Sequence, residues 1–74
     1  MGRIVAQIIR NAVRALRATR SMTQQDLATA VGVSRQTIIA IELHGHSTSL
    51  KVAFGIANAF DLPVEKVFRY EARD

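Results

Sequence analysis

Cysteine is absent from this sequence of 74 residues, and long hydrophobic runs are absent as well. Without cysteine the chain forms no disulfides and offers no thiolate to a metal, which suits a reducing compartment. The longest apolar stretches, such as residues 38–41, fall far short of the roughly 18 residues that a membrane span requires. The N-terminus contains arginines and lacks the apolar segment of a signal peptide. We therefore expect a cytoplasmic protein that makes no contact with membranes.

Acidic residues are scarce in the first half of the chain. Residues 1–35 contain six arginines and one aspartate, whereas residues 36–74 contain four basic and five acidic residues. The total net charge of +4 is a weak argument by itself, because many small soluble proteins are equally basic. The distribution of charge predicts that an anion such as DNA docks on the N-terminal half.

The chain is short for a hydrophobic content of 49%. A domain of this size buries only about 60% of the surface that its unfolded chain exposes. Part of the apolar surface is therefore expected to meet a second subunit, for which a homodimer is the simplest arrangement. We find no repeat, low-complexity segment or internal boundary, so residues 1–74 are predicted to form one domain.

Apolar residues recur every three to four positions through most of the chain, which predicts helices. The isoleucine-rich and valine-rich start leaves a strand at about residues 3–9 as an alternative to helix. Residues 70–74 are expected to form a frayed, charged tail. The expected helices are residues 3–20, 24–31, 35–43, 50–60 and a short fifth helix that begins at Pro63 and carries Val64, Val67 and Phe68.

Local sequence features mark the ends of these helices. Thr23 and Asp26 have the spacing of a capping box before the second helix. Gly32 is expected to adopt a positive φ that ends this helix, and Ser34 and Ser49 are expected to cap the third and fourth helices. Two helices joined by such a tight turn form a helix-turn-helix, whose second helix fits the major groove of DNA.

The segment 22–42, MTQQDLATAVGVSRQTIIAIE, resembles the Cro/phage-repressor (XRE) helix-turn-helix family at nearly every diagnostic position. The resemblance implies an all-α, five-helix lambda-repressor-like domain with a central helix-turn-helix. It also implies a transcriptional regulator, expected to be a repressor, that binds a palindromic operator in duplex DNA as a homodimer. It covers residues 11–68 and includes Val13, Leu16, Arg17 and the segment SLKVAF at residues 49–54.

The resemblance places the DNA contacts at the start of the second and third helices. Gln24, at the start of the second helix, is expected to hold a phosphate with its amide and the helix dipole. Arg35 and Gln36 lie in the first turn of the recognition helix, where arginine suits O6 and N7 of guanine and glutamine suits N6 and N7 of adenine. Either Thr37 or Ser34 is expected to hold phosphate.

Two residues of the third helix depart from the family pattern. Ile39 and Ala40 continue toward the groove on the family's register, but Ile39 stands where a polar residue is usual. Its side chain either packs on a thymine methyl group or joins a contact with another protein. Leu43 stands where the family often has asparagine. These departures keep a second function open, that of a protein-interaction module or antitoxin-type subunit that binds a protein partner.

His44 and His46 flank a glycine in the loop after the third helix. Two histidines alone are a weak metal motif, so contact with DNA phosphate is the better interpretation. The family's usual Asn-Gly-Lys loop, whose backbone contacts phosphate, is replaced here by Leu43, His44 and Gly45. The sequence contains no nucleophile motif and no glycine-rich phosphate loop, so we expect neither an enzyme nor a cofactor.

Arg17 and Glu42 match a family pair that forms a buried ion pair between the first and third helices. Taken alone, these residues would be interpreted as solvated surface charges, since isolated charge pairs contribute little to stability. The resemblance instead predicts a direct salt bridge that is at least partly buried.

Two apolar segments outside the motif are candidates for the dimer interface. The C-terminal segment ranks slightly ahead on family grounds, whereas the N-terminal segment has an alternative role in packing on the fifth helix of its own chain. A two-fold dimer would place its recognition helices about 34 Å apart. The N-terminal segment contains Ile4, Val5, Ile8 and Ile9, and the C-terminal segment contains Val64, Val67, Phe68 and Tyr70.

Overall fold

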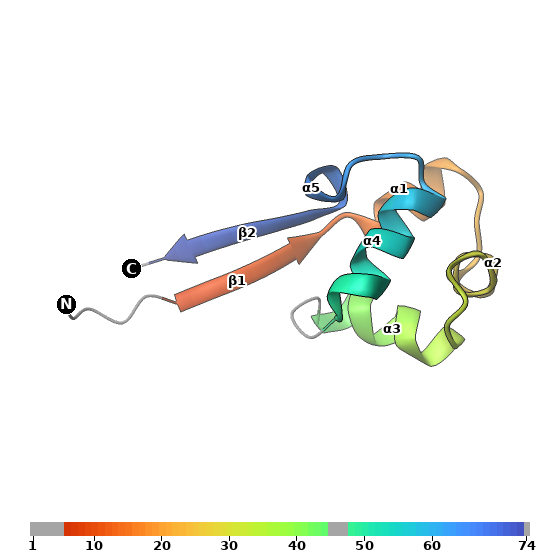
Figure 1. Ribbon diagram of the computed structural model, residues 1–74, viewed down its shortest axis with the longest axis horizontal. Helices are drawn as coiled ribbons and strands as arrows, with labels where there is room; N and C mark the ends of the chain where they lie inside the picture. Colours follow the sequence, from red (N-terminus) through yellow and green to blue (C-terminus); the bar gives the residue numbers. More distant parts are fainter. Residues whose placement is uncertain (1–5, 45–47, 74) are drawn as a thin grey trace.

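The computed structural model describes the backbone of residues 6–44 and 48–73, and the side chains of residues 9–44 and 48–70. Within these residues, the helices gather into one body from which a two-stranded ribbon extends (Figure 1). The elements are β1 (Ala6–Asn11), α1 (Val13–Thr19), α2 (Gln24–Val31), α3 (Arg35–His44), α4 (Leu50–Ala59), α5 (Val64–Val67) and β2 (Phe68–Arg73).

The core lies between the helices and draws residues from all of them. Ala28 on α2 is fully buried, and its small side chain lets α2 and α3 approach closely. Burial of the larger side chains supplies most of the driving force for folding. The core residues are Val13, Leu27, Ala28, Ile38, Ile41, Ile56, Ala57, Phe60 and Val67.

The predicted caps of α2, α3 and α4 are confirmed by hydrogen bonds and by a backbone angle. Thr23 Oγ1 accepts from the Asp26 amide at 2.9 Å, and Asp26 Oδ2 accepts from the Thr23 amide at 2.9 Å, which completes the capping box. Gly32 ends α2 with a φ of 86°. Ser34 and Ser49 each accept a backbone N–H at 3.2 Å, at the starts of α3 and α4. α2 therefore ends at Gly32 and α3 begins after Ser34, which leaves the tight turn that a helix-turn-helix requires.

The prediction of one helix over residues 3–20 was wrong in its first half. Ala6–Asn11 is a strand, and helix α1 begins only at Val13. Residues 3–5 lie outside the described part, so the outcome concerns residues 6–12. The physical reason is that β-branched side chains such as those of Ile8 and Ile9 favour extended backbone when a partner strand is available. The strand alternative had the right element type at this place.

The prediction of a frayed C-terminal tail was also wrong. β2 pairs antiparallel with β1, from Asn11 opposite Phe68 to Ala6 opposite Arg73. β2 also takes Phe68, which had been assigned to the fifth helix, so that α5 ends at Val67. The pairing joins the two ends of the chain, and no local pattern in either segment reports such a distant partner.

Hydrogen bonds connect the base of the ribbon to the helices. The Ala12 amide donates to the Val67 carbonyl oxygen at 2.9 Å, next to the last pair of the ribbon. Asn11 Nδ2 donates to the Ile41 carbonyl oxygen of α3 at 3.0 Å, while its Oδ1 accepts from the Val13 amide at 3.2 Å. An isolated two-stranded ribbon is only marginally stable in water, so these bonds help to set its position.

The described residues contain no helix that is long and apolar enough to cross a bilayer. Among the described side chains, those of residues 9–44 and 48–70, no cluster of three or more His, Asp or Glu could hold a metal ion.

Candidate nucleic-acid interface

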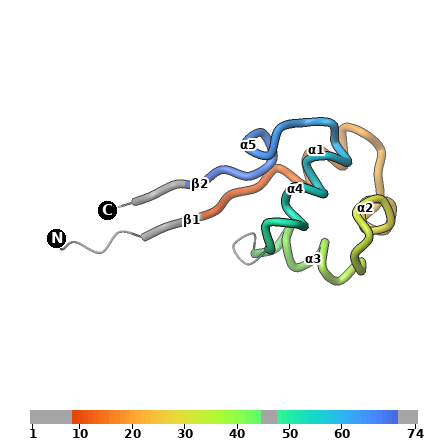
Figure 2. The backbone as a smooth tube through the Cα atoms, viewed as in Figure 1, coloured from red at the N-terminus to blue at the C-terminus, as the bar shows by residue number. Residues whose placement is uncertain are grey.

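The turn between α2 and α3 lies at the end of the molecule opposite to the ribbon, as the tube in Figure 2 shows. Arg35 and Gln36 form the first turn of α3, and both side chains are exposed. Neither side chain has a hydrogen-bond or ion-pair partner among the described residues. Their donors and acceptors are therefore directed to solvent or to a ligand.

Ser34 and Thr37 are engaged with each other at the start of α3. Ser34 Oγ lies 3.0 Å from Thr37 Oγ1 and accepts from the Thr37 amide at 3.2 Å. Ser34 is exposed and Thr37 is half-buried. Each hydroxyl retains hydrogen-bonding capacity beyond this contact, and a role of either one in holding phosphate stays a prediction.

A shallow hollow of about 700 Å³ brings Gln24 and Arg35 together. Its wall includes Thr23 and Gln25, so it lies at the N-terminus of α2, where the helix dipole favours negative charge. Arg17 and Met22 also line it. The hollow therefore combines a helix N-terminus with the guanidinium of Arg35, which is suitable chemistry for a phosphate.

A second hollow of about 330 Å³ lies between α3 and the start of α4. Thr37, Ala40 and His44 from α3 line it together with Ser49, the N-cap of α4. The structure therefore brings three of the predicted contact residues to one face of α3. His46, the other predicted histidine, lies outside the described residues.

Ile39 lies on a different stripe of α3 from Ala40. It lines a third hollow, of about 260 Å³, together with Leu43 and with Arg14 of α1. Ile39 is half-buried, whereas Leu43 is 73% exposed. The apolar stripe therefore faces the side where α1 and α2 approach α3, and Gln24 lines the same hollow.

Arg17 and Glu42 form the salt bridge that the resemblance implies. Nε of Arg17 lies 2.6 Å from Oε2 of Glu42, and the two side chains are 14% and 6% exposed. A second bond joins Arg17 Nη2 to Oε1 of Glu42 at 3.1 Å. Arg17 Nη1 also donates to the Met22 carbonyl oxygen at 2.9 Å, so the guanidinium ties the turn before α2 to α3.

Glu42 has a second partner that the sequence did not indicate. Gln24 Nε2 donates to its Oε1 at 3.1 Å. Burial opposes the charge of Glu42, but hydrogen bonds from Arg17 and Gln24, together with the charges of Arg17 and Arg14, hold the pKa of this carboxyl below its ordinary value. The bond to Glu42 raises the pKa of Arg17 in turn. The pair is therefore ionised at neutral pH.

Arg20 makes a structural contact that the net charge of the sequence could not predict. Its guanidinium carbon lies 5.2 Å from the centroid of the Phe60 ring, and Nη2 donates to the Phe60 carbonyl oxygen at 3.1 Å. The contact satisfies a carbonyl at the end of α4 and covers the ring of a core residue. Arg20 is consequently engaged in joining α1 to α4.

The predicted interface residues differ widely in exposure. Val67 is 2% exposed and belongs to the core, so its side chain presents almost no surface to a second subunit. Val64 and Phe68 are half-buried against the core, whereas Tyr70 is 62% exposed. The N-terminal candidates Ile4 and Ile8 have side chains outside the described part. Of the C-terminal candidates, Tyr70 is thus the one with a largely exposed side chain.

Comparison with known proteins agrees with this geometry. Residues 13–67 match the helix-turn-helix family. An HTH-type transcriptional regulator of Methanocaldococcus jannaschii, MJ0272, is 49% identical over 63 residues, which cover 85% of this chain and 96% of the relative. A second HTH-type transcriptional regulator, from Archaeoglobus fulgidus, is 36% identical over 66 residues, or 89% of this chain and 93% of the relative. The regulator YgzD of Bacillus subtilis is 41% identical over 63 residues, or 85% and 96%. This chain belongs to the XRE-type helix-turn-helix family of DNA-binding transcriptional regulators.

Proposed function

We propose that this protein is a sequence-specific repressor that binds a palindromic operator as a homodimer. The N-terminus of α3 enters the major groove, where Arg35 and Gln36 contact base edges. Gln24 binds the flanking phosphate, and the hydroxyls of Ser34 and Thr37 and the ring of His44 add backbone contacts. Occupation of the operator in the cytoplasm would then exclude other proteins from the same DNA.

The observation that carries this proposal is the exposed first turn of α3. A side chain with an internal partner would have to break that contact before binding a base. Arg35 and Gln36 have no partner among the described residues, and arginine and glutamine are the residue types that bind guanine and adenine with two hydrogen bonds. The hollow shared by Arg35 and Gln24 supports a phosphate contact beside the base contacts.

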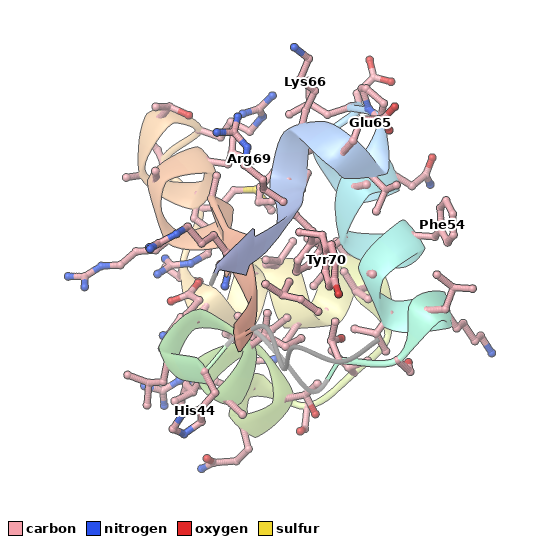
Figure 3. All side chains as sticks on the ribbon, turned by 90° about the vertical axis from the view of Figure 1, so that its left-hand side faces the viewer. His44, Phe54, Glu65, Lys66, Arg69 and Tyr70 are labelled. Carbon is pink, nitrogen blue, oxygen red and sulfur yellow. The ribbon has the colours of Figure 1, made fainter. Side chains whose placement is uncertain are left out.

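The homodimer rests on apolar side chains that the described part of the chain leaves uncovered. Leu50 and Phe54 are 72% and 53% exposed and lie four residues apart, on one face of α4. Figure 3 shows Phe54 projecting outward from α4, and it shows Tyr70 on strand β2. Exposed leucine and phenylalanine are expected at a subunit interface. The proposed interface therefore contains Leu50, Phe54 and Tyr70, and it excludes the buried Val67.

A salt titration tests the proposal. Duplex DNA should bind with an affinity that falls steeply as salt rises, because each phosphate contact releases a counterion. An operator-containing duplex should bind roughly a thousandfold more tightly than a random duplex at the same salt. Equal affinity for all sequences would contradict the proposal of a specific operator. An affinity that does not change with salt would contradict the proposed phosphate contacts.

The exposed Leu43 favours a second candidate function, the binding of a protein partner. Ile39 and Leu43 present an apolar stripe beside Arg14, where a DNA backbone would prefer polar side chains. A toxin-like partner could cover this stripe. The variant Leu43→Asn separates the two functions, because it should preserve or improve DNA binding while weakening an apolar protein contact.

A further inference from the structure

Gln24 is tied to the ion pair beside it. Its Nε2 donates to Glu42 Oε1 at 3.1 Å, the same oxygen that accepts from Arg17 Nη2 at 3.1 Å. The second oxygen, Oε2, accepts from Arg17 Nε at 2.6 Å. Glu42 thus contacts the last turn of α1 and the first residue of α2 from its place on α3. The carboxylate of Glu42 therefore links α2, which is proposed to bind phosphate, to α3, which is proposed to bind bases.

We propose that Glu42 is a positioning residue for the DNA backbone contact, because it holds the Gln24 amide in one place while leaving an N–H of that amide for a phosphate oxygen. This role rests on the proposed function. It goes beyond the structural role of the salt bridge, since it assigns to Glu42 a share in DNA affinity.

The chemistry of the two groups supports this role. A carboxylate only accepts hydrogen bonds, so Glu42 fixes Nε2 as the atom that faces it. Nε2 carries two hydrogens, and the bond to Glu42 uses one of them. An unrestrained glutamine would lose side-chain conformational entropy on binding, whereas a restrained one has lost much of it beforehand.

Arg17 makes this arrangement compatible with an anion. A buried carboxylate without a partner would repel a phosphate bound at the same glutamine. Two bonds from the guanidinium compensate the charge of Glu42, and Arg14 adds a favourable electrostatic interaction. Arg35 lines the hollow in which this phosphate would lie. The local balance of charge at Gln24 therefore favours an anion.

The first measurement needs no DNA. In the free protein, nuclear magnetic resonance relaxation of the Gln24 side-chain amide should report a rigid group, whereas the exposed amide of Gln36 should be mobile. Glu42→Gln keeps the shape of the side chain but weakens the bond, so it should make the Gln24 amide about as mobile as that of Gln36. A Gln24 amide that is already mobile in the parent protein would overturn the proposal.

The second measurement is a double-mutant cycle with a random-sequence duplex. Gln24→Ala should weaken binding about fivefold in the parent protein and less than about twofold in the Glu42→Gln background. Gln25→Ala is the matched control, because Gln25 Nε2 donates to Thr29 Oγ1 at 3.2 Å on the same helix. Its effect should be equal in both backgrounds. Circular dichroism establishes that each variant is folded at the temperature used.

The outcomes separate this role from the proposed function. A rigid amide with coupled effects on binding supports the positioning role. A rigid amide with additive effects overturns it and leaves the DNA-binding function intact. If the parent protein binds no duplex, the proposed function fails together with the phosphate role, and the relaxation data still decide whether Glu42 holds Gln24.

Discussion

Arg17 and Arg35 carry the same charge, but they have opposite surroundings. Arg17 is 14% exposed and makes hydrogen bonds to Glu42 and Met22, whereas Arg35 is exposed at the start of α3. The composition shows that the N-terminal half is basic, but it could not distinguish an arginine in a salt bridge from an exposed one. The family pattern separated Arg17 from the DNA contacts. Nothing in the sequence indicated the contact between Arg20 and Phe60, which depends on the packing of α1 against α4.

The Arg17–Glu42 pair should be important for stability. Glu42→Ala leaves the guanidinium without its carboxylate in a site that is largely buried, so the free energy of unfolding should fall by about 3 kcal/mol in urea titrations. The double variant Arg17→Met with Glu42→Leu should recover part of this loss, because it removes both charges together. A single variant as stable as the parent protein would contradict the buried-pair interpretation.

Acid should weaken the fold through the same carboxyl. The pKa of Glu42 lies below its ordinary value of 4.5 in the folded protein, so its contribution to stability is present above about pH 4.5 and is lost as pH falls through the folded pKa. Unfolding measured between pH 6 and pH 2 should therefore show a smaller acid-dependent loss in Glu42→Gln than in the parent protein. Some acid dependence should remain, because hydrogen bonds from the Thr23 amide and hydroxyl also lower the pKa of Asp26. Identical pH profiles for the two proteins would contradict this account.

The helices and the ribbon differ in how far the sequence predicts them. Helix ends have local features, such as the capping box at Thr23 and the positive φ of Gly32, and these were recognised in the sequence. The ribbon depends on pairing between the two ends of the chain, and a stripe of Ile8 and Ile9 suits a helix or a strand until the partner is known. Non-local pairing therefore accounts for both errors in the predicted fold.

The side chain of Asn11 links the ribbon to α1 and to the recognition helix, α3. Its amide bridges Val13 at the start of α1 and Ile41 on α3. Asn11→Ala should lower the free energy of unfolding by about 1–2 kcal/mol, because it removes the side-chain partner of the Val13 amide and of the Ile41 carbonyl oxygen. Asn58→Ala, at an exposed position on α4, is the control and should change stability by less than about 0.5 kcal/mol. Equal effects of the two substitutions would show that the bridge contributes nothing.

The proposed dimer explains how so small a domain could recognise an operator. A single recognition helix contacts only a few base pairs, and two copies about 34 Å apart would reach successive major-groove faces. In Figure 3, His44 on α3 lies far from Lys66 and Arg69 near the base of β2. The proposed DNA-facing surface of α3 and the side chains of Lys66 and Arg69 therefore lie on different sides of the molecule.

The apolar face of α4 should control the oligomeric state. Leu50→Glu combined with Phe54→Glu would place charges at the centre of the proposed interface, so sedimentation at micromolar concentration should change from dimer to monomer. The exposed Leu43 provides a matched control, and Leu43→Glu should remain dimeric. The parent protein sedimenting as a monomer, or a double variant that stays dimeric, would rule out this interface.

Selection of bound duplexes from a random DNA pool measures whether the start of α3 recognises a DNA sequence. The parent protein should enrich an inverted repeat whose half-sites are about one helical turn apart. Arg35→Ala and Gln36→Ala should each lose preference at a defined base position within the half-site, equivalent to about 1–3 kcal/mol of discrimination, while Gln24→Ala should weaken binding to all sequences alike. A pool that shows no enriched sequence with the parent protein, or the same enriched sequence with Arg35→Ala and Gln36→Ala, would contradict recognition by the start of α3.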